Sequence, residues 1–253
     1  MGNGLSPTRG LLAVVVIGMA VLTGAAAPVQ AYVIDSFTAV NNPTFTQVSP
    51  APPPTIWSFS KSFPNPADGW AAVTSIPGMV PTATTGRVAD SGIANVFGGN
   101  RTVTSATPNA RMSQPVGFAV DTVNGLLSSF TASQSSTTLT LSYGPIDLNG
   151  ATAIEVDYRA DHDATADLEI NGLPADGTQS LIGDALFHTL IFPISGFGIS
   201  TMDLIFNANP QALDFELFEV RTQIIPEPLS LAIWLLTGLA GVGLVRVCRR
   251  REK

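Results

Sequence analysis

Residues 138–143 read Thr-Leu-Thr-Leu-Ser-Tyr, so that apolar and small hydroxyl-bearing side chains alternate one by one. Successive side chains of an extended strand point to opposite faces, and this alternation therefore predicts a strand with one buried and one solvated face. The central part of the chain shows no convincing helical period. Further segments that we expect to be strands are 56–61, 101–107, 116–121, 126–132, 154–159, 168–170, 186–192, 202–206 and 215–220.

Turn-forming residues separate these segments. The chain contains 23 Gly and 19 Pro but only 12% charged residues, a composition that suits many short strands better than long exposed helices. Asn149-Gly150, Asn171-Gly172 and Asp176-Gly177 are expected turns. We therefore predict an all-β fold, an antiparallel jelly-roll-like β-sandwich with few and short helices.

The N-terminus has the three parts of a secretory signal peptide. Arg9 supplies a positive charge, residues 11–22 are apolar, and small residues then lead to Ala31. We expect a signal helix exported by Sec-type machinery and cleaved between Ala31 and Tyr32, with a cut after Ala27 as the alternative. The other interpretation is an uncleaved membrane helix.

The C-terminus predicts a membrane anchor. A transmembrane helix is expected over residues 229–247, because the apolar run 229–245, extended by a snorkelling Arg246, approaches the thickness of a bilayer. The basic residues that follow or close it favour a cytoplasmic C-terminus, with the body outside. This basic tail contains Arg246, Arg249, Arg250 and Arg251.

The tripeptide Pro226-Glu227-Pro228 stands directly before this apolar stretch. Two prolines resist helix formation and leave an extended strip that an enzyme could bind. A PEP tripeptide, an apolar helix and an arginine cluster in this order resemble the PEP-CTERM sorting signal. The resemblance implies recognition by an exosortase-type membrane enzyme in bacteria that make exopolysaccharide. A plain single-pass anchor is the alternative, and it leaves the tripeptide unexplained.

These signals divide the chain into three parts. Residues 1–31 form the expected signal peptide, 32–225 the sandwich ectodomain and 226–253 the sorting segment. Residues 41–54 are rich in Pro, Thr, Ser and Asn, and we expect a loop that covers a sheet edge or a poorly ordered arm. No repeat or second domain is evident.

The charge of the body excludes one class of partner. Between residues 32 and 225 there are six basic and seventeen acidic side chains, a net charge of −11. Nucleic acid binding needs a basic surface, so no nucleic-acid partner is expected. The single cysteine, Cys248, lies beyond the apolar stretch and offers the body neither a disulfide nor a thiol metal site.

A second, looser resemblance covers most of the body. The stretches Ile34-Asp35-Ser36-Phe37, Gly98-Gly99-Asn100-Arg101-Thr102-Val103 and 213–220 occur in this order around the alternating segments. The order is similar to that of many PEP-CTERM proteins with a galactose-binding-like jelly-roll sandwich. That fold often serves in carbohydrate-binding modules, but a fold alone does not establish a function.

The body holds few candidates for chemistry. Asp161, Asp163 and Asp167 could form a calcium loop, since hard cations take several oxygen ligands from one loop, but they lack EF-hand spacing and a solvated acidic turn is the favoured alternative. His162 and His188 show no triad or metal pattern. No catalytic residue, resident metal or cofactor is expected.

Two further features have a structural alternative. Gly98-Gly99-Asn100 lacks the context of a phosphate loop and favours a turn or bulge. Four aromatic residues could stack on sugar rings, although core or edge packing is favoured for most of them. They are Trp57, Phe59, Phe63 and Trp70.

Together these patterns predict a non-enzymatic protein of the cell envelope or extracellular matrix. It would pass through a single-pass inner-membrane intermediate and be processed at its C-terminal signal. The alternatives are a carbohydrate-binding module for exopolysaccharide and, less favoured for want of a nucleophile or metal set, a secreted hydrolase.

Overall fold

The computed structural model describes residues 31–48, 56–60, 68–75, 82–110, 116–131, 137–208 and 213–223. The chain divides into two compact units, Met1–Ala31 and Tyr32–Lys253, and the described residues other than Ala31 belong to the second. The expected signal helix, the Pro226-Glu227-Pro228 tripeptide, the apolar stretch 229–247 and the basic tail lie outside the described residues. No helix able to cross a membrane occurs in the described part of the chain.

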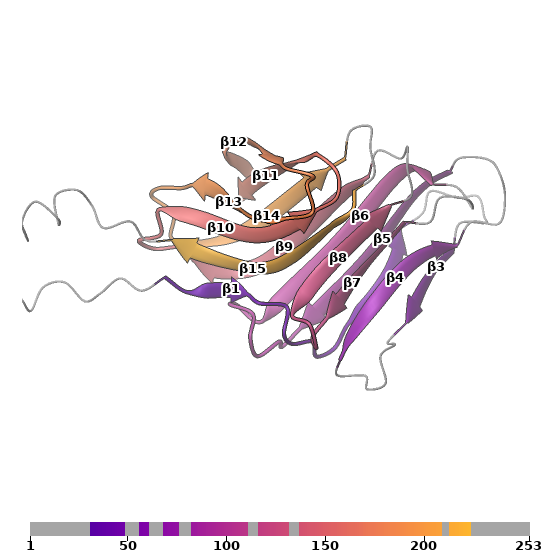
Figure 1. The fold of residues 1–253 in the computed structure, drawn as a ribbon. Helices are drawn as coiled ribbons and strands as arrows, with labels where there is room; N and C mark the ends of the chain where they lie inside the picture. Colours follow the sequence, from indigo (N-terminus) through magenta and orange to yellow (C-terminus); the bar gives the residue numbers. More distant parts are fainter. Residues whose placement is uncertain are drawn as a thin grey trace, which may run out of the picture. The chain divides into compact units, whose positions relative to one another are not determined.

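Two antiparallel sheets make up the described part of the body (Figure 1). The first, sheet A, has the order β13-β10-β15-β8-β7-β4-β3, and β1 also pairs with β15. Its strands are β1 (Val33–Asp35), β3 (Ile56–Ser60), β4 (Gly69–Ser75), β7 (Val116–Asp121), β8 (Leu126–Thr131), β10 (Ala153–Ala160), β13 (Phe187–Pro193) and β15 (Phe215–Gln223).

The second sheet, sheet B, has the order β12-β11-β14-β9-β6-β5-β2. Its strands are β2 (Thr44–Val48), β5 (Thr82–Ser91), β6 (Asn100–Ala110), β9 (Thr138–Asp147), β11 (Ala164–Ile170), β12 (Leu173–Leu181) and β14 (Ile199–Asn207). The chain crosses repeatedly between the sheets, as in jelly-roll sandwiches. The prediction of an all-β antiparallel sandwich is confirmed.

The core lies between the sheets and follows the alternation of the sequence. On β9, Leu139, Leu141 and Tyr143 are buried while the intervening hydroxyl-bearing residues are half-buried on the outer face. Aromatic contacts join the two layers, because the rings of Phe206 on β14 and Phe215 on β15 lie 4.8 Å apart. The predicted inward face of residues 138–143 is thus confirmed.

Two local expectations were wrong. Part of the expected loop 41–54 forms strand β2, which pairs with β5 at the edge of sheet B. Its side chains are almost all exposed, so it lacks the buried face that makes a strand recognisable. The expected turn Asp176-Gly177 lies within β12, where the pairing with β11 changes register on both sides of Leu168. Bulges of this kind accommodate turn-forming residues inside a strand.

Candidate functional site

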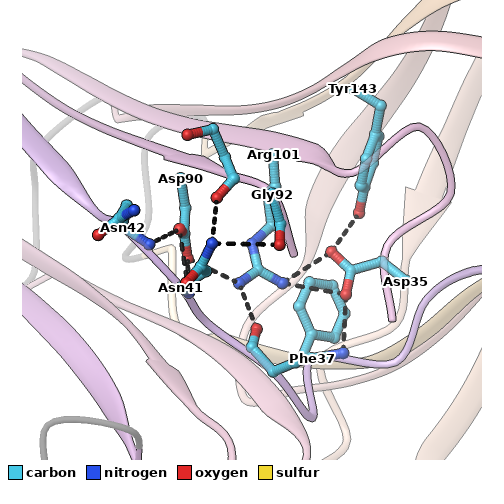
Figure 2. A network of polar contacts seen from close by, with 10 residues as sticks. Asp35, Phe37, Asn41, Asn42, Asp90, Gly92, Arg101 and Tyr143 are labelled. Carbon is cyan, nitrogen blue, oxygen red and sulfur yellow. Dashed lines mark hydrogen bonds and ion pairs between the residues drawn. The ribbon is translucent and has the colours of Figure 1, made fainter. Parts of the chain in front are cut away.

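A buried network of charged and hydrogen-bonding side chains joins both sheets (Figure 2). Arg101 on β6 donates from Nη1 to both carboxylate oxygens of Asp35 at 3.0 and 2.8 Å, and lies 3.9 Å from Asp90. The Tyr143 hydroxyl donates to Asp35 at 3.2 Å. Desolvation raises the pKa of Asp35, with partial opposition from the Arg101 charge, and burial raises the pKa of Tyr143 well above its usual value.

This network is structural. Asp35, Asp90, Arg101 and Tyr143 are each at most 3% exposed, so a ligand in solution does not reach them. The network instead brings together the stretches on which the second resemblance rests, since Asp35 belongs to the first and Arg101 to the second. The third stretch forms the start of β15, which pairs with β1.

An accessible candidate site is a hollow on the outer face of sheet A. It has a volume of about 410 Å³ and lies where β8 and β10 end and β15 begins. This volume is within the range of small-molecule sites, roughly 300–1,000 Å³. We call it the outer groove, and its lining residues are Ser128, Ser129, Phe130, Arg159, Asp161, Ala185, Asp214, Phe215 and Glu216.

Arg159 is the central polar side chain of the outer groove. Its guanidinium donates to Glu216 on the neighbouring strand β15 and lies 5.6 Å from the ring centre of Phe187 and 6.0 Å from that of Phe218. The two rings are 4.8 Å apart. Cation–π contact and the ion pair therefore hold the arginine in place beside the hollow.

A bulge in β15 helps to expose these groups. Asp157 of β10 pairs with Glu219, but the next residue of β10 pairs with Leu217, which leaves Phe218 as the extra residue. Both Phe218 and Glu219 are half-buried rather than inward-facing. Phe187, at the start of the edge strand β13, is 68% exposed. Bulges commonly redirect side chains toward binding sites in this way.

Phe130 forms a second aromatic surface in the outer groove. It lies directly opposite Gly117 of β7 and is 38% exposed. A Cβ atom added at Gly117 would lie 2.1 Å from the tip of the Phe130 ring. The absence of a side chain at residue 117 therefore lets this ring lie across the face of the sheet.

Carboxylates complete the polar lining. Asp214 is half-buried, and its Oδ1 accepts a hydrogen bond from the Thr131 amide at 2.6 Å. Burial raises the pKa of Asp214, and the nearby charge of Asp161 adds to this effect, whereas the Thr131 amide and His162 oppose it. The groove thus combines exposed aromatic rings with charged groups able to bond to hydroxyls.

The candidate calcium residues do not share one set of contacts. Asp161 lines the outer groove, Asp163 accepts a hydrogen bond from the Gly183 amide at 2.8 Å, and Asp167 lies on β11, where it accepts from Thr178 at 2.6 Å. Among the residues that the structure describes, no group of three or more His, Cys, Asp or Glu side chains could hold a metal ion.

Neither histidine lines the outer groove. His188 Nε2 is 2.8 Å from Asp184 Oδ1, and its ring packs against Tyr158. His162 is in the exposed turn between β10 and β11. The hydrogen bond from the Leu186 amide, followed by that from His188, lowers the pKa of Asp184.

The aromatic platform considered from the sequence is mostly core. Trp57 and Trp70 are 4% and 0% exposed, and the Trp57 indole donates to Thr84 of the opposite sheet at 2.6 Å. Phe59 is half-buried and stacks on Phe45, whereas Phe63 lies outside the described residues. Gly98 and Gly99 have φ of 81° and 71° in the turn before β6, as the turn interpretation expects.

Sequence reasoning missed the aromatic residues that flank the groove. Phe187 and Phe218 were assigned to strands, but their packing against Arg159 follows from the pairing of β10 with both β13 and β15. The available signal was the outward position of Arg159 in the alternating segment 154–159. Its neighbours could not be found without the register.

Comparisons with known proteins give no family for this chain. No family model and no curated protein matches it. Among solved structures it is similar to a glycoside hydrolase family 43 arabinoxylan arabinofuranohydrolase from Bacillus subtilis, with 10% identity over 62% of this chain and a TM-score of 0.31. The match spans 52% of the hydrolase, or about half its length.

Two similar structures are binding modules. One is the CBM22-1 xylan-binding domain from Paenibacillus barcinonensis, with 14% identity, 40% of this chain and 84% of that chain covered, and a TM-score of 0.25. The other is a family 11 carbohydrate-binding module from Clostridium thermocellum, with 11% identity, coverages of 79% and 99%, and a TM-score of 0.31. These values are low, so what the groove binds is inferred from this chain's own residues.

Proposed function

We propose that this protein is an exported, non-enzymatic component of the cell envelope or extracellular matrix, whose sandwich binds exopolysaccharide through the outer groove. The observation that supports this most is the combination of exposed rings and charged groups around one open hollow. Aromatic faces pack against the apolar faces of sugar rings, while carboxylates and a guanidinium bond to the hydroxyls.

The non-enzymatic part of the proposal is supported by how two of the groove's three carboxylates are engaged. Glu216 is paired with Arg159, and Asp214 accepts a backbone amide hydrogen bond. A glycosidase needs one carboxyl group as acid and a second as base or nucleophile across the scissile bond. Groups held in these contacts suit retention of a glycan better than its hydrolysis.

A polysaccharide-binding assay tests the groove. Phe187→Ala removes an exposed ring, and Arg159→Gln removes the charge while keeping a polar side chain. Each is expected to weaken binding to purified exopolysaccharide by at least about tenfold, or roughly 1.4 kcal/mol. The measurement is depletion of the protein from solution by immobilised polysaccharide.

Ile191→Ala is the matched control, because Ile191 is also exposed on β13 but lies opposite Glu155, whereas Phe187 lies opposite Arg159 of the outer groove. It should leave binding unchanged. If the wild type binds no polysaccharide, or if Phe187→Ala binds as well as the wild type, the proposal that the outer groove binds exopolysaccharide is wrong.

We also propose that delivery uses the Pro226-Glu227-Pro228 signal, read by an exosortase-type enzyme after Sec-type export with the C-terminus in the cytoplasm. The ordered tripeptide, apolar stretch and Arg cluster support this. In a host that has the enzyme, intact-mass measurement should show surface protein without Leu229–Lys253. Replacing the three motif residues by alanine should retain that segment. Wild-type surface protein that still carries it would contradict the sorting proposal.

A further inference from the structure

The beginning and the end of the described body lie side by side. Val33 of β1 pairs with Arg221 of β15, the Tyr32 amide donates to Thr222 Oγ1 at 3.0 Å, and the Thr222 amide donates to the Tyr32 carbonyl at 3.0 Å. In Figure 1 the arrowhead of β15 lies next to the start of β1. Both connections to the segments outside the sandwich therefore leave from one end.

Strand β15 is hydrogen-bonded to its neighbours as far as Gln223, its last described residue. The Gln223 carbonyl accepts hydrogen bonds from the Thr152 amide at 2.9 Å and from Thr152 Oγ1 at 3.1 Å. The Ile194 amide in turn donates to the Thr152 carbonyl at 2.9 Å. Six residue steps separate Gln223 from Leu229, and even a fully extended chain spans about 20 Å over that number.

Several loops surround this point. Phe97 donates to the Ile34 carbonyl at 2.8 Å and stacks on Tyr32, and Leu148 donates to the Gly198 carbonyl at 3.0 Å. We call this surface the terminal end. It is made by residues 31–34, 93–99, 145–152 and 193–200 around Gln223.

The terminal end is nearly uncharged. Within these four described segments Asp147 is the one charged residue, although the body carries a net charge of −11. Three apolar side chains are exposed there: Val33 by 43%, Phe97 by 37% and Ile199 by 77%. The opposite end of β10 and β15 also exposes apolar side chains such as Leu186, but it is acidic, with Asp161, Asp163, Asp184 and Asp214 in its loops.

We infer that the terminal end rests on the surface of the phospholipid bilayer in which the chain's own C-terminal segment is inserted. This inference depends on the proposed membrane insertion of residues 229–247. The short tether keeps the terminal end close to the bilayer, and exposed apolar side chains gain free energy in the interfacial layer. The acidic loops, by contrast, are repelled by anionic lipids.

This orientation has a consequence for the outer groove. The groove lies at the start of β15, eight residue steps from Gln223, which corresponds to about 25 Å along the strand. The groove therefore faces the surroundings while the sandwich stands on the membrane.

Lipid-quenching of site-specific labels tests the orientation. The full chain, with Cys248→Ser, is reconstituted into phosphatidylcholine vesicles that contain lipids spin-labelled at the headgroup. A fluorophore is attached at Ile199→Cys or Ser195→Cys on the terminal end, or at Leu186→Cys, which is 62% exposed on the acidic end. We expect at least about twofold quenching at the first two positions and little at Leu186.

Vesicle flotation distinguishes a wrong orientation of the sandwich from a wrong membrane anchor. If the chain floats with the vesicles but the labels at residues 195 and 199 are quenched no more than the label at residue 186, the orientation is wrong while the membrane anchor stands. If the chain does not float, the anchor itself is wrong, and the inference fails with it. The three labelled sites are exposed, so the substitutions leave the core intact.

Discussion

Two arginines of this protein have similar partners but opposite surroundings. Arg101 and Arg159 each pair with a carboxylate and lie over a phenylalanine ring, at 5.5 Å from Phe37 in the first case and 5.6 Å from Phe187 in the second. The Arg101 side chain is 0% exposed, however, and that of Arg159 is 40% exposed.

This difference in burial decides what the same chemistry does. In the interior, a charge left without its partner is strongly destabilising, so the Arg101 network must stay intact for the fold to persist. At the surface, an ion pair contributes little to stability and water already competes for it. Arg159 and its aromatic neighbours are therefore free to exchange water for a ligand.

The largest expected effect is that of Arg101→Met. The change leaves the Asp35 carboxylate buried without its cation, and we expect a loss of about 3–5 kcal/mol in the free energy of unfolding. Urea unfolding followed by tryptophan fluorescence measures it, because Trp57 and Trp70 lie in the core. Arg159→Met is the matched control and should cost less than about 1 kcal/mol. Equal losses for the two variants would remove the distinction between the two arginines.

Two glycines that face aromatic rings, Gly86 in the interior and Gly117 at the surface, should show the same contrast with a smaller loss of stability. A Cβ added at Gly86 would lie 2.4 Å from the buried ring of Trp57, which cannot move without losing its hydrogen bond to Thr84. Gly86→Ala should therefore cost about 1–3 kcal/mol of unfolding free energy. Gly117→Ala meets the exposed ring of Phe130, which can rotate outward, so its cost should be near 0.5 kcal/mol, about that of a surface change.

The two glycine variants should differ in binding as well. Gly117→Ala displaces a ring of the outer groove and should weaken polysaccharide binding, whereas folded Gly86→Ala should bind normally. If Gly117→Ala proved less stable than Gly86→Ala, Phe130 would be a core residue and the comparison would fail.

The smallest expected effect is a difference in pH dependence between carboxylates. Desolvation acts to raise the pKa of Asp157, but hydrogen bonds from Arg221 and Thr189 outweigh it and bring the pKa below its ordinary value of 3.8. Its contribution to stability is thus present above that value and is lost as the pH falls through the folded-state pKa. For Asp35 the pKa is raised, so its contribution declines as the pH rises.

Unfolding midpoints of wild type and Asp157→Asn between pH 2 and pH 7 measure this effect. The wild type should be more stable at neutral pH by less than about 1 kcal/mol, because both side chains of the ion pair remain partly exposed to water. The two curves should converge at the acid end. A difference that grows as the pH falls would contradict the assigned direction.

Much of the sandwich was predictable because its signals are local. Alternation located residues 138–143 of strand β9, and turn residues located the hairpin at Asn171-Gly172, where φ is 55° and 74°. The short strand β1 escaped detection because three residues show no period. The exposed edge strand β2 has no buried face, so its pattern is indistinguishable from that of a loop.

The groove was less predictable than the strands that carry it. Arg159 and Glu216 are 57 positions apart in the chain, and their contact depends on the pairing of β10 with β15. Asp161 was noted as part of an acidic turn, but its place beside Asp214 follows from the same pairing. No local pattern records which outward-facing side chains become neighbours.

By itself, the sequence determined the all-β class of the body, most strand positions and the acidic charge, because backbone alternation and turn chemistry act within a few residues. Only the tertiary structure decided which arginine is a buried support and which is an exposed contact. Burial and neighbours are properties of the register between distant strands. The packing of the two sheets brings Asp35 to Arg101 inside the core, and the register of β10 with β13 brings Phe187 to Arg159 on the surface.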